Sequence, residues 1–102
     1  MKNDPIYSAY ADDEEMLELV EMFVGEMPER ITALNTAWQG NAREQVQRIA
    51  HQLKGASAGY GFAAVGRSAA DLEAALKDVD RELTSVKAEF EALVNLCQRV
   101  AL

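Results

Sequence analysis

Apolar residues recur at steps of three and four along most of the chain, which is the spacing of one face of an α-helix. The most regular run lies near the C-terminal end and consists of Leu83, Val86, Phe90, Leu93, Cys97 and Val100. No stretch shows the period-two alternation typical of a half-buried strand. The pattern therefore predicts an all-α fold in which each helix turns a narrow apolar stripe toward a common core.

Helix-start and helix-stop residues divide the first apolar region into two predicted helices. Asp12, with Glu15 three residues later, resembles a capping box and begins a helix that runs to about Glu26. Pro28 suits the first turn of a second helix, and Gly40 suits its C-terminal end. The sequence therefore predicts a break in the middle of this region.

The rest of the chain divides into three further helices joined by short connections. Asn41 and Glu44 form a capping pair that opens a helix ending among residues 59–61, and another helix follows from about Phe62. A polar turn at residues 77–81 precedes the last helix. Short connections favour antiparallel neighbours, so a helical bundle over residues 12–102 is expected, after a leader at residues 1–11 that lies on the domain or frays from it.

Composition narrows the possible partners and the compartment. The 102-residue chain is the size of one domain and carries a net charge of −7, with an acidic stretch between Asp12 and Glu29. This charge argues against binding to nucleic acid or an anionic membrane, and no apolar run is long enough to span a bilayer. The single cysteine, Cys97, is expected to fill the core. Because it cannot form an internal disulfide, the sequence favours a reducing compartment, and the cytoplasm is expected.

The only histidine, His51, lies opposite the apolar face of its predicted helix. That face consists of Val46, Ile49, Leu53, Ala56 and Tyr60. One turn after His51, Lys54 can place its ammonium beside the imidazole, and Gly55 leaves the ring uncovered. His51 is therefore expected to be exposed and open to a bulky partner.

The sequence offers little support for metal or nucleotide chemistry. One histidine and one cysteine, 46 positions apart, do not make a metal site, and no phosphate-binding loop of the P-loop type occurs. Without a nucleotide site, the chain is not expected to take phosphate from ATP by itself, and no cofactor is expected. A hydrolase that uses His51 as a base would lack a second catalytic group.

His51 is better suited to act as a nucleophile. An exposed imidazole is largely neutral at cytoplasmic pH, and it attacks through one nitrogen when a hydrogen bond fixes the other. Glu73 is the candidate for that bond, because it lies at the border of the apolar stripe of the next helix. Lys54 would then screen the charge of an attached phosphoryl group.

The segment H-Q-L-K-G-A-S-A-G-Y-G-F, from His51 to Phe62, resembles the signature of histidine-containing phosphotransfer (HPt) domains of two-component phosphorelays. The resemblance implies an antiparallel four-helix bundle with a short additional N-terminal helix, here Asp12 to about Glu26. It also implies that His51 is the phosphoacceptor and Lys54 its positive neighbour. Glu73 falls where several members place a Glu or Gln bonded to the histidine ring.

The resemblance also implies the partners: a response-regulator receiver domain, which supplies the acceptor aspartate and Mg²⁺, and a sensor histidine kinase. The expected docking surface consists of Gly55, Ala58, Gly59, Gln47 and Arg48, with Met16 or Leu19 from the first helix as further candidates. The domain is expected to be a monomer, either free-standing or part of a hybrid kinase. The alternative function is a non-phosphorylated helical adaptor that docks receiver or kinase domains.

Overall fold

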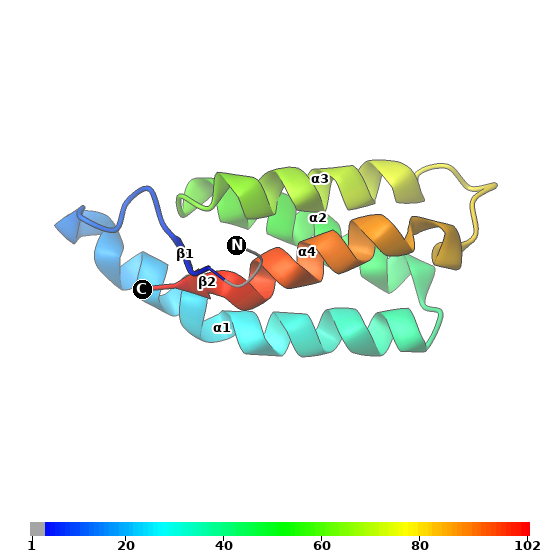
Figure 1. The fold of residues 1–102 in the computed structure, drawn as a ribbon, viewed down its shortest axis with the longest axis horizontal. Helices are drawn as coiled ribbons and strands as arrows, with labels where there is room; N and C mark the ends of the chain where they lie inside the picture. Colours follow the sequence, from blue (N-terminus) through cyan, green and yellow to red (C-terminus); the bar gives the residue numbers. More distant parts are fainter. Residues whose placement is uncertain (1–3) are drawn as a thin grey trace.

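Four α-helices lie side by side along the long axis of the molecule, whose computed structural model describes residues 4–102 (Figure 1). They are α1 (Glu14–Gln39), α2 (Arg43–Gly59), α3 (Ala63–Leu76) and α4 (Lys87–Arg99). Contacts join α1 to α2, α2 to α3, α3 to α4, and α4 back to α1, so the four helices enclose one core. The all-α prediction is confirmed.

The predicted break in the first apolar region is wrong, because α1 is one helix of 26 residues with Pro28 inside it. A proline in a helix interior costs about 3 kcal/mol. Burial of one large apolar side chain contributes about 1.5–3 kcal/mol, and α1 buries such residues on both sides of Pro28, including Phe23, Met27 and Leu34. The shared core outweighs the local stop signal. The described residues therefore contain no additional short N-terminal helix.

The predicted N-caps of α1 and α2 differ from the observed ones by one residue. Asp13, not Asp12, caps α1, and its carboxylate accepts a hydrogen bond from the Glu15 amide at 3.0 Å. Asn41 does not cap α2; it adopts a left-handed conformation with φ of 55°, and Ala42 precedes the helix without a side-chain bond. The predicted helix ends are confirmed at Gly40 for α1 and Gly59 for α2, as is the start of α3 after Phe62.

The thiol of Cys97 lies within the core, as the apolar stripe of the last helix predicts. The residue is 1% exposed, and burial raises its pKa to about 12. A thiol in this setting stays protonated and packs as a small apolar group.

Small residues let α2 and α3 approach each other closely. A Cβ atom at Gly66 of α3 would lie 3.4 Å from the Lys54 carbonyl oxygen and 3.7 Å from the Ala58 Cβ. Ala50 and Ser57 of α2 are fully buried, although the predicted apolar face did not include them. The close approach brings the side chains at the outer border of the two helices within hydrogen-bonding reach of each other.

The connection between α3 and α4 is held by one side chain from the start of α2. The Arg43 guanidinium donates to the carbonyl oxygens of Leu76 at 2.7 Å and Asp78 at 2.6 Å, and also to that of Arg81. After this connection a short 3-10 helix, η1 (Leu83–Val86), leads into α4. The predicted last helix therefore begins as a 3-10 turn.

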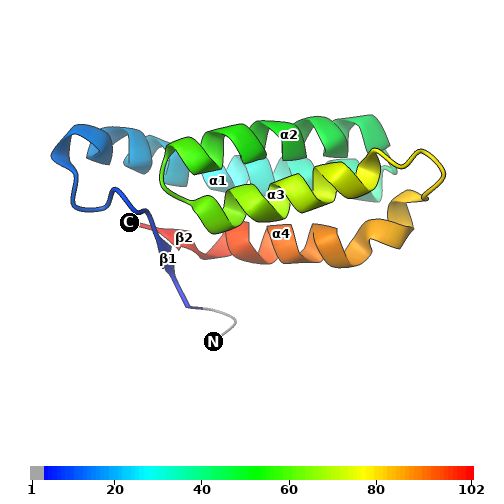
Figure 2. The same ribbon diagram turned by 90° about the horizontal axis from the view of Figure 1, so that it is seen from above.

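Two short strands, which the sequence pattern did not predict, join the ends of the described chain (Figure 2). Strand β1 (Ile6–Tyr7) runs parallel to β2 (Val100–Ala101), so Val100 belongs to a strand and not to α4. Two residues are too few to show a period of two, which explains why the pattern could not reveal them.

The leader lies on the domain through residues 4–11, while Met1 to Asn3 fall outside the described residues. The Ser8 hydroxyl, which is buried, donates to the Tyr60 carbonyl oxygen at 2.6 Å and accepts from the Tyr10 amide at 2.9 Å. The Ala9 amide donates to the Gly61 carbonyl oxygen at 2.9 Å. These bonds fasten the leader to the turn between α2 and α3.

Replacing Gly61 by Ala is expected to lower the free energy of unfolding by about 2 kcal/mol or more, because Gly61 has a left-handed φ of 86°. The added Cβ would also lie 2.4 Å from the Ser8 hydroxyl oxygen. Urea denaturation measures the effect. Gly25→Ala is the matched control: a Cβ at this exposed site in α1 meets nothing within 4 Å, and a gain of about 1 kcal/mol is expected. Equal effects of the two substitutions would refute this explanation.

Candidate functional site

His51 projects from α2 toward solvent, with 66% of its side chain exposed. The residues that anchor this part of α2 in the core, Ala50 and Leu53, are fully buried. The exposure agrees with the sequence pattern. The imidazole is therefore accessible to a second molecule.

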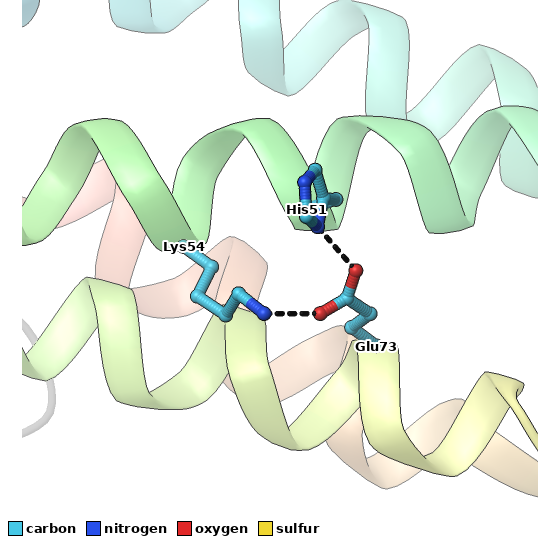
Figure 3. A network of polar contacts seen from close by, with 3 residues as sticks. All are labelled: His51, Lys54 and Glu73. Atoms are coloured by element: carbon cyan, nitrogen blue, oxygen red, sulfur yellow. Dashed lines mark hydrogen bonds and ion pairs between the residues drawn. The ribbon is translucent and has the colours of Figure 1, made fainter.

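Glu73 of α3 is the hydrogen-bond partner of the ring (Figure 3). Its Oε2 lies 2.6 Å from Nδ1 of His51, and its Oε1 accepts a hydrogen bond from Nζ of Lys54 at 2.7 Å. The side chain of Glu73 is only 7% exposed, whereas those of both partners are largely or partly open to solvent. One buried carboxylate thus holds the imidazole and the ammonium group together.

The hydrogen bond from Lys54 is the main cause that lowers the pKa of Glu73 below its ordinary value of 4.5. Burial acts in the opposite direction, and the hydrogen bond from His51 adds to the lowering. An ionised carboxylate has no proton to give, so Nδ1 of His51 must be the donor in their bond. In the neutral ring the lone pair then lies on Nε2, and this is the nitrogen that can act as a nucleophile.

The Lys54 ammonium has a partner that the sequence pattern did not predict. It is hydrogen-bonded to Glu73 across the interface between α2 and α3, and Glu73 also holds the imidazole. The close approach of the two helices makes this ion pair possible. The side chain is still 40% exposed, so the ammonium lies at the edge of the site.

Two glycines extend from His51 along the exposed side of α2. Residues 51, 55 and 59 are four apart, so they lie one above the next on the helix surface. We call Gly55 and Gly59 the glycine row. A Cβ atom added at Gly55 or Gly59 would meet nothing within 4 Å. Ala58 beside them is also exposed. The surface next to the imidazole is therefore smooth and uncovered.

The other predicted docking residues differ in their accessibility. Arg48 is exposed, and Gln47 is half-buried. On α1, Leu19 is 41% exposed, whereas Met16 is half-buried and packs against the core. Docking roles for these four residues remain predictions.

One neighbour of this surface, which no sequence pattern predicted, comes from the leader. Tyr10 lies beside Gly61, two residues after the end of the glycine row. Its Cδ2 would be 3.0 Å from a Cβ atom added at Gly61. The Ser8 hydroxyl, which accepts a hydrogen bond from the Tyr10 amide, donates to the Tyr60 carbonyl oxygen, 52 positions away in the sequence. No local pattern signals a contact over such a separation.

Within residues 4–102, no three His, Cys, Asp or Glu side chains are grouped so that they could hold a metal ion. In the same part of the chain, no helix has the length and apolar character needed to cross a bilayer.

Glu73→Gln is expected to lower the free energy of unfolding at neutral pH and to lower it less in acid. Since the pKa of Glu73 is lowered in the folded state, its carboxylate stabilises the fold fully above its ordinary value of 4.5. This contribution is lost progressively as the pH falls from 4.5 to below the lowered pKa of Glu73, because the carboxylate becomes protonated. The unfolding free energies of the wild type and Glu73→Gln, measured by urea denaturation from pH 7 to pH 3, should converge in acid. A constant difference would contradict the ion-pair assignment.

Comparison with known proteins gives one family. The model of the Hpt domain matches residues 18–101, which is most of the chain and includes His51, Lys54 and Glu73. Neither the curated proteins nor the solved structures gave a match. Hpt domains are phosphocarriers with a phosphotransfer role in two-component systems, and they have no catalytic site of their own. On this match, and with a helical fold that agrees with it, the chain belongs to the Hpt domain family.

Proposed function

We propose that the chain is an antiparallel four-helix phosphorelay carrier that exchanges a phosphoryl group between His51 and the aspartate of a receiver domain. The observation that carries this proposal is the bond between Nδ1 of His51 and the buried Glu73, combined with a ring that is 66% exposed. One nitrogen is fixed and the other is free and accessible. This is the arrangement that a reusable nucleophile needs.

In the proposed transfer, the lone pair of Nε2 attacks the phosphorus atom of the receiver's aspartyl phosphate. A P–N bond forms, the bond between phosphorus and the aspartyl oxygen breaks, and the aspartate leaves as a carboxylate with the electron pair. The ring keeps its Nδ1 proton and becomes positively charged, so the adjacent Glu73 carboxylate stabilises the product. Mg²⁺ on the receiver would neutralise phosphoryl charge, and the reverse reaction follows the same path.

Lys54 is proposed to serve both states of His51. In the unphosphorylated chain its ammonium orients Glu73 through a 2.7 Å hydrogen bond. A phosphoryl group on Nε2 would bring negative charge to the edge of the site, where the partly exposed Lys54 can turn toward it. Lys54 would then stabilise the phosphorylated form.

The receiver is proposed to dock over the glycine row, where Gly55 and Gly59 leave room for a bulky partner. A sensor histidine kinase would be the other source or end point of the phosphoryl group. We place this exchange in the cytoplasm and expect the carrier to act as a monomer.

A labelling experiment tests the proposal. Receivers from the same genome are phosphorylated with a radioactive phosphoryl group and mixed with the chain and Mg²⁺. Label should move to the chain as an acid-labile, base-stable adduct, and the labelled peptide should contain His51. Failure of every receiver to label the chain, or an adduct stable to acid, would refute the proposal.

A further inference from the structure

The leader places an aromatic side chain at the end of the proposed docking surface. Tyr10 is 38% exposed, and its ring lies beside Gly61 in the turn that follows α2. Its amide donates to the Ser8 hydroxyl, which in turn donates to the Tyr60 carbonyl oxygen. Tyr10 is thus held against the bundle and is not on a loose tail.

The distance from the phosphoacceptor is suited to a shared interface. From residue 51 to residue 59 the helix rises about 12 Å, at 1.5 Å per residue. A standard protein interface covers about 800 Å² on each partner, which corresponds to a disc about 16 Å in radius. A receiver centred near His51 and lying along the glycine row would therefore reach the turn where Tyr10 lies.

The residue type also fits a contact role. Tyrosine presents a large, rigid apolar surface with a polar end, and it is enriched among the residues that dominate binding energy at interfaces. The neighbouring Gly55, Ala58 and Gly59 offer little side-chain area of their own. An aromatic ring at the edge of this smooth surface would supply the apolar contact that the glycine row lacks.

We propose that Tyr10 is a receiver-contact residue contributed by the leader, and that Ser8 is the positioning residue that holds it in place. This inference rests on the proposed function, because it assigns part of the receiver interface. It makes residues 8–10 a determinant of which receiver binds.

The test compares Tyr10→Ala with Tyr7→Ala. Tyr7 is a matched control because it is in the same leader and is more exposed, at 59%, but it pairs with Ala101 at the C-terminal strand. Transfer from a phosphorylated receiver is measured over a range of receiver concentrations. Tyr10→Ala should raise the half-saturating receiver concentration at least fivefold and leave the rate at saturation unchanged, whereas Tyr7→Ala should change neither. Thermal unfolding checks that both variants remain folded.

Ser8→Ala provides a second, independent test of positioning. Loss of the hydroxyl removes the bonds to Tyr60 and Tyr10, so it should also raise the half-saturating concentration. In the background of Tyr10→Ala it should add little, because the two residues act through the same contact. A lower rate at saturation with an unchanged half-saturating concentration would contradict the positioning role of Ser8.

The outcomes separate this inference from the proposed function. If the wild type is labelled and Tyr10→Ala behaves like Tyr7→Ala, the leader contact is wrong and the carrier function stands. If no receiver labels the wild type, the carrier function fails, and the leader contact fails with it.

Discussion

His51→Gln is expected to lower phosphoryl transfer by at least 100-fold, to the background of the assay. An amide nitrogen has no available lone pair, so it cannot form the P–N bond. Gln can still approach Glu73 with its amide group, and the position is largely exposed, so the fold and receiver binding should be retained. Transfer from a labelled receiver, together with a binding measurement on the same variant, tests the two parts separately.

A displaced histidine gives the control for this result. Gln52→His combined with His51→Gln moves the imidazole by one position to another exposed site on α2. One residue turns the side chain by about 100° around the helix, so the ring would lie away from the glycine row and lose its place beside Glu73. Labelling should not recover. Recovery in the double variant would show that any exposed imidazole on α2 suffices, and the assigned geometry would be wrong.

Glu73→Ala is expected to slow transfer about 10- to 100-fold, the loss typical when the carboxylate that orients a metal-binding histidine is removed. Without the carboxylate, Nδ1 loses its acceptor, the proton can occupy either ring nitrogen, and the charge that develops on the ring is no longer balanced. The loss should appear in the rate at saturating receiver, because Glu73 is buried and does not reach the partner.

Asp71→Ala is the matched control, since Asp71 is an exposed acid on the same helix, two residues away. It should leave the rate unchanged. Equal rates for the wild type and Glu73→Ala would reject the orienting role of Glu73. A change confined to the half-saturating concentration would assign Glu73 to binding instead.

Local patterns predicted most of the helices, and they failed where distant contacts decided the structure. The C-terminal end of α2 and the start of α3 follow from glycines and apolar spacing within a few residues of each other. Pro28 is a strong local stop signal, but the core contacts of Phe23 and Leu34 on either side of it override that signal. The pair formed by β1 and β2 joins residues more than 90 positions apart, so neither strand alone carried a recognisable signal.

In the site, too, local spacing was predictable and contacts between helices were not. His51 and Gly55 lie within two turns of one helix, so their common surface follows from helical spacing alone. Glu73 could be proposed because it borders an apolar stripe. The partner of Lys54 could not be predicted, because the ion pair depends on how closely α2 and α3 approach each other. That distance is determined by Gly66 and its neighbours.

The contacts of Arg43 restrict which residues this position can accept. One guanidinium nitrogen donates to the carbonyl oxygens of Leu76 and Asp78, and a second donates to that of Arg81. A lysine would keep the charge, but it would offer one compact donor group in place of a planar fork. Substitutions that are conservative elsewhere on the surface would therefore loosen the chain between α3 and η1. Homologues that lack arginine here should have a shorter or differently built connection.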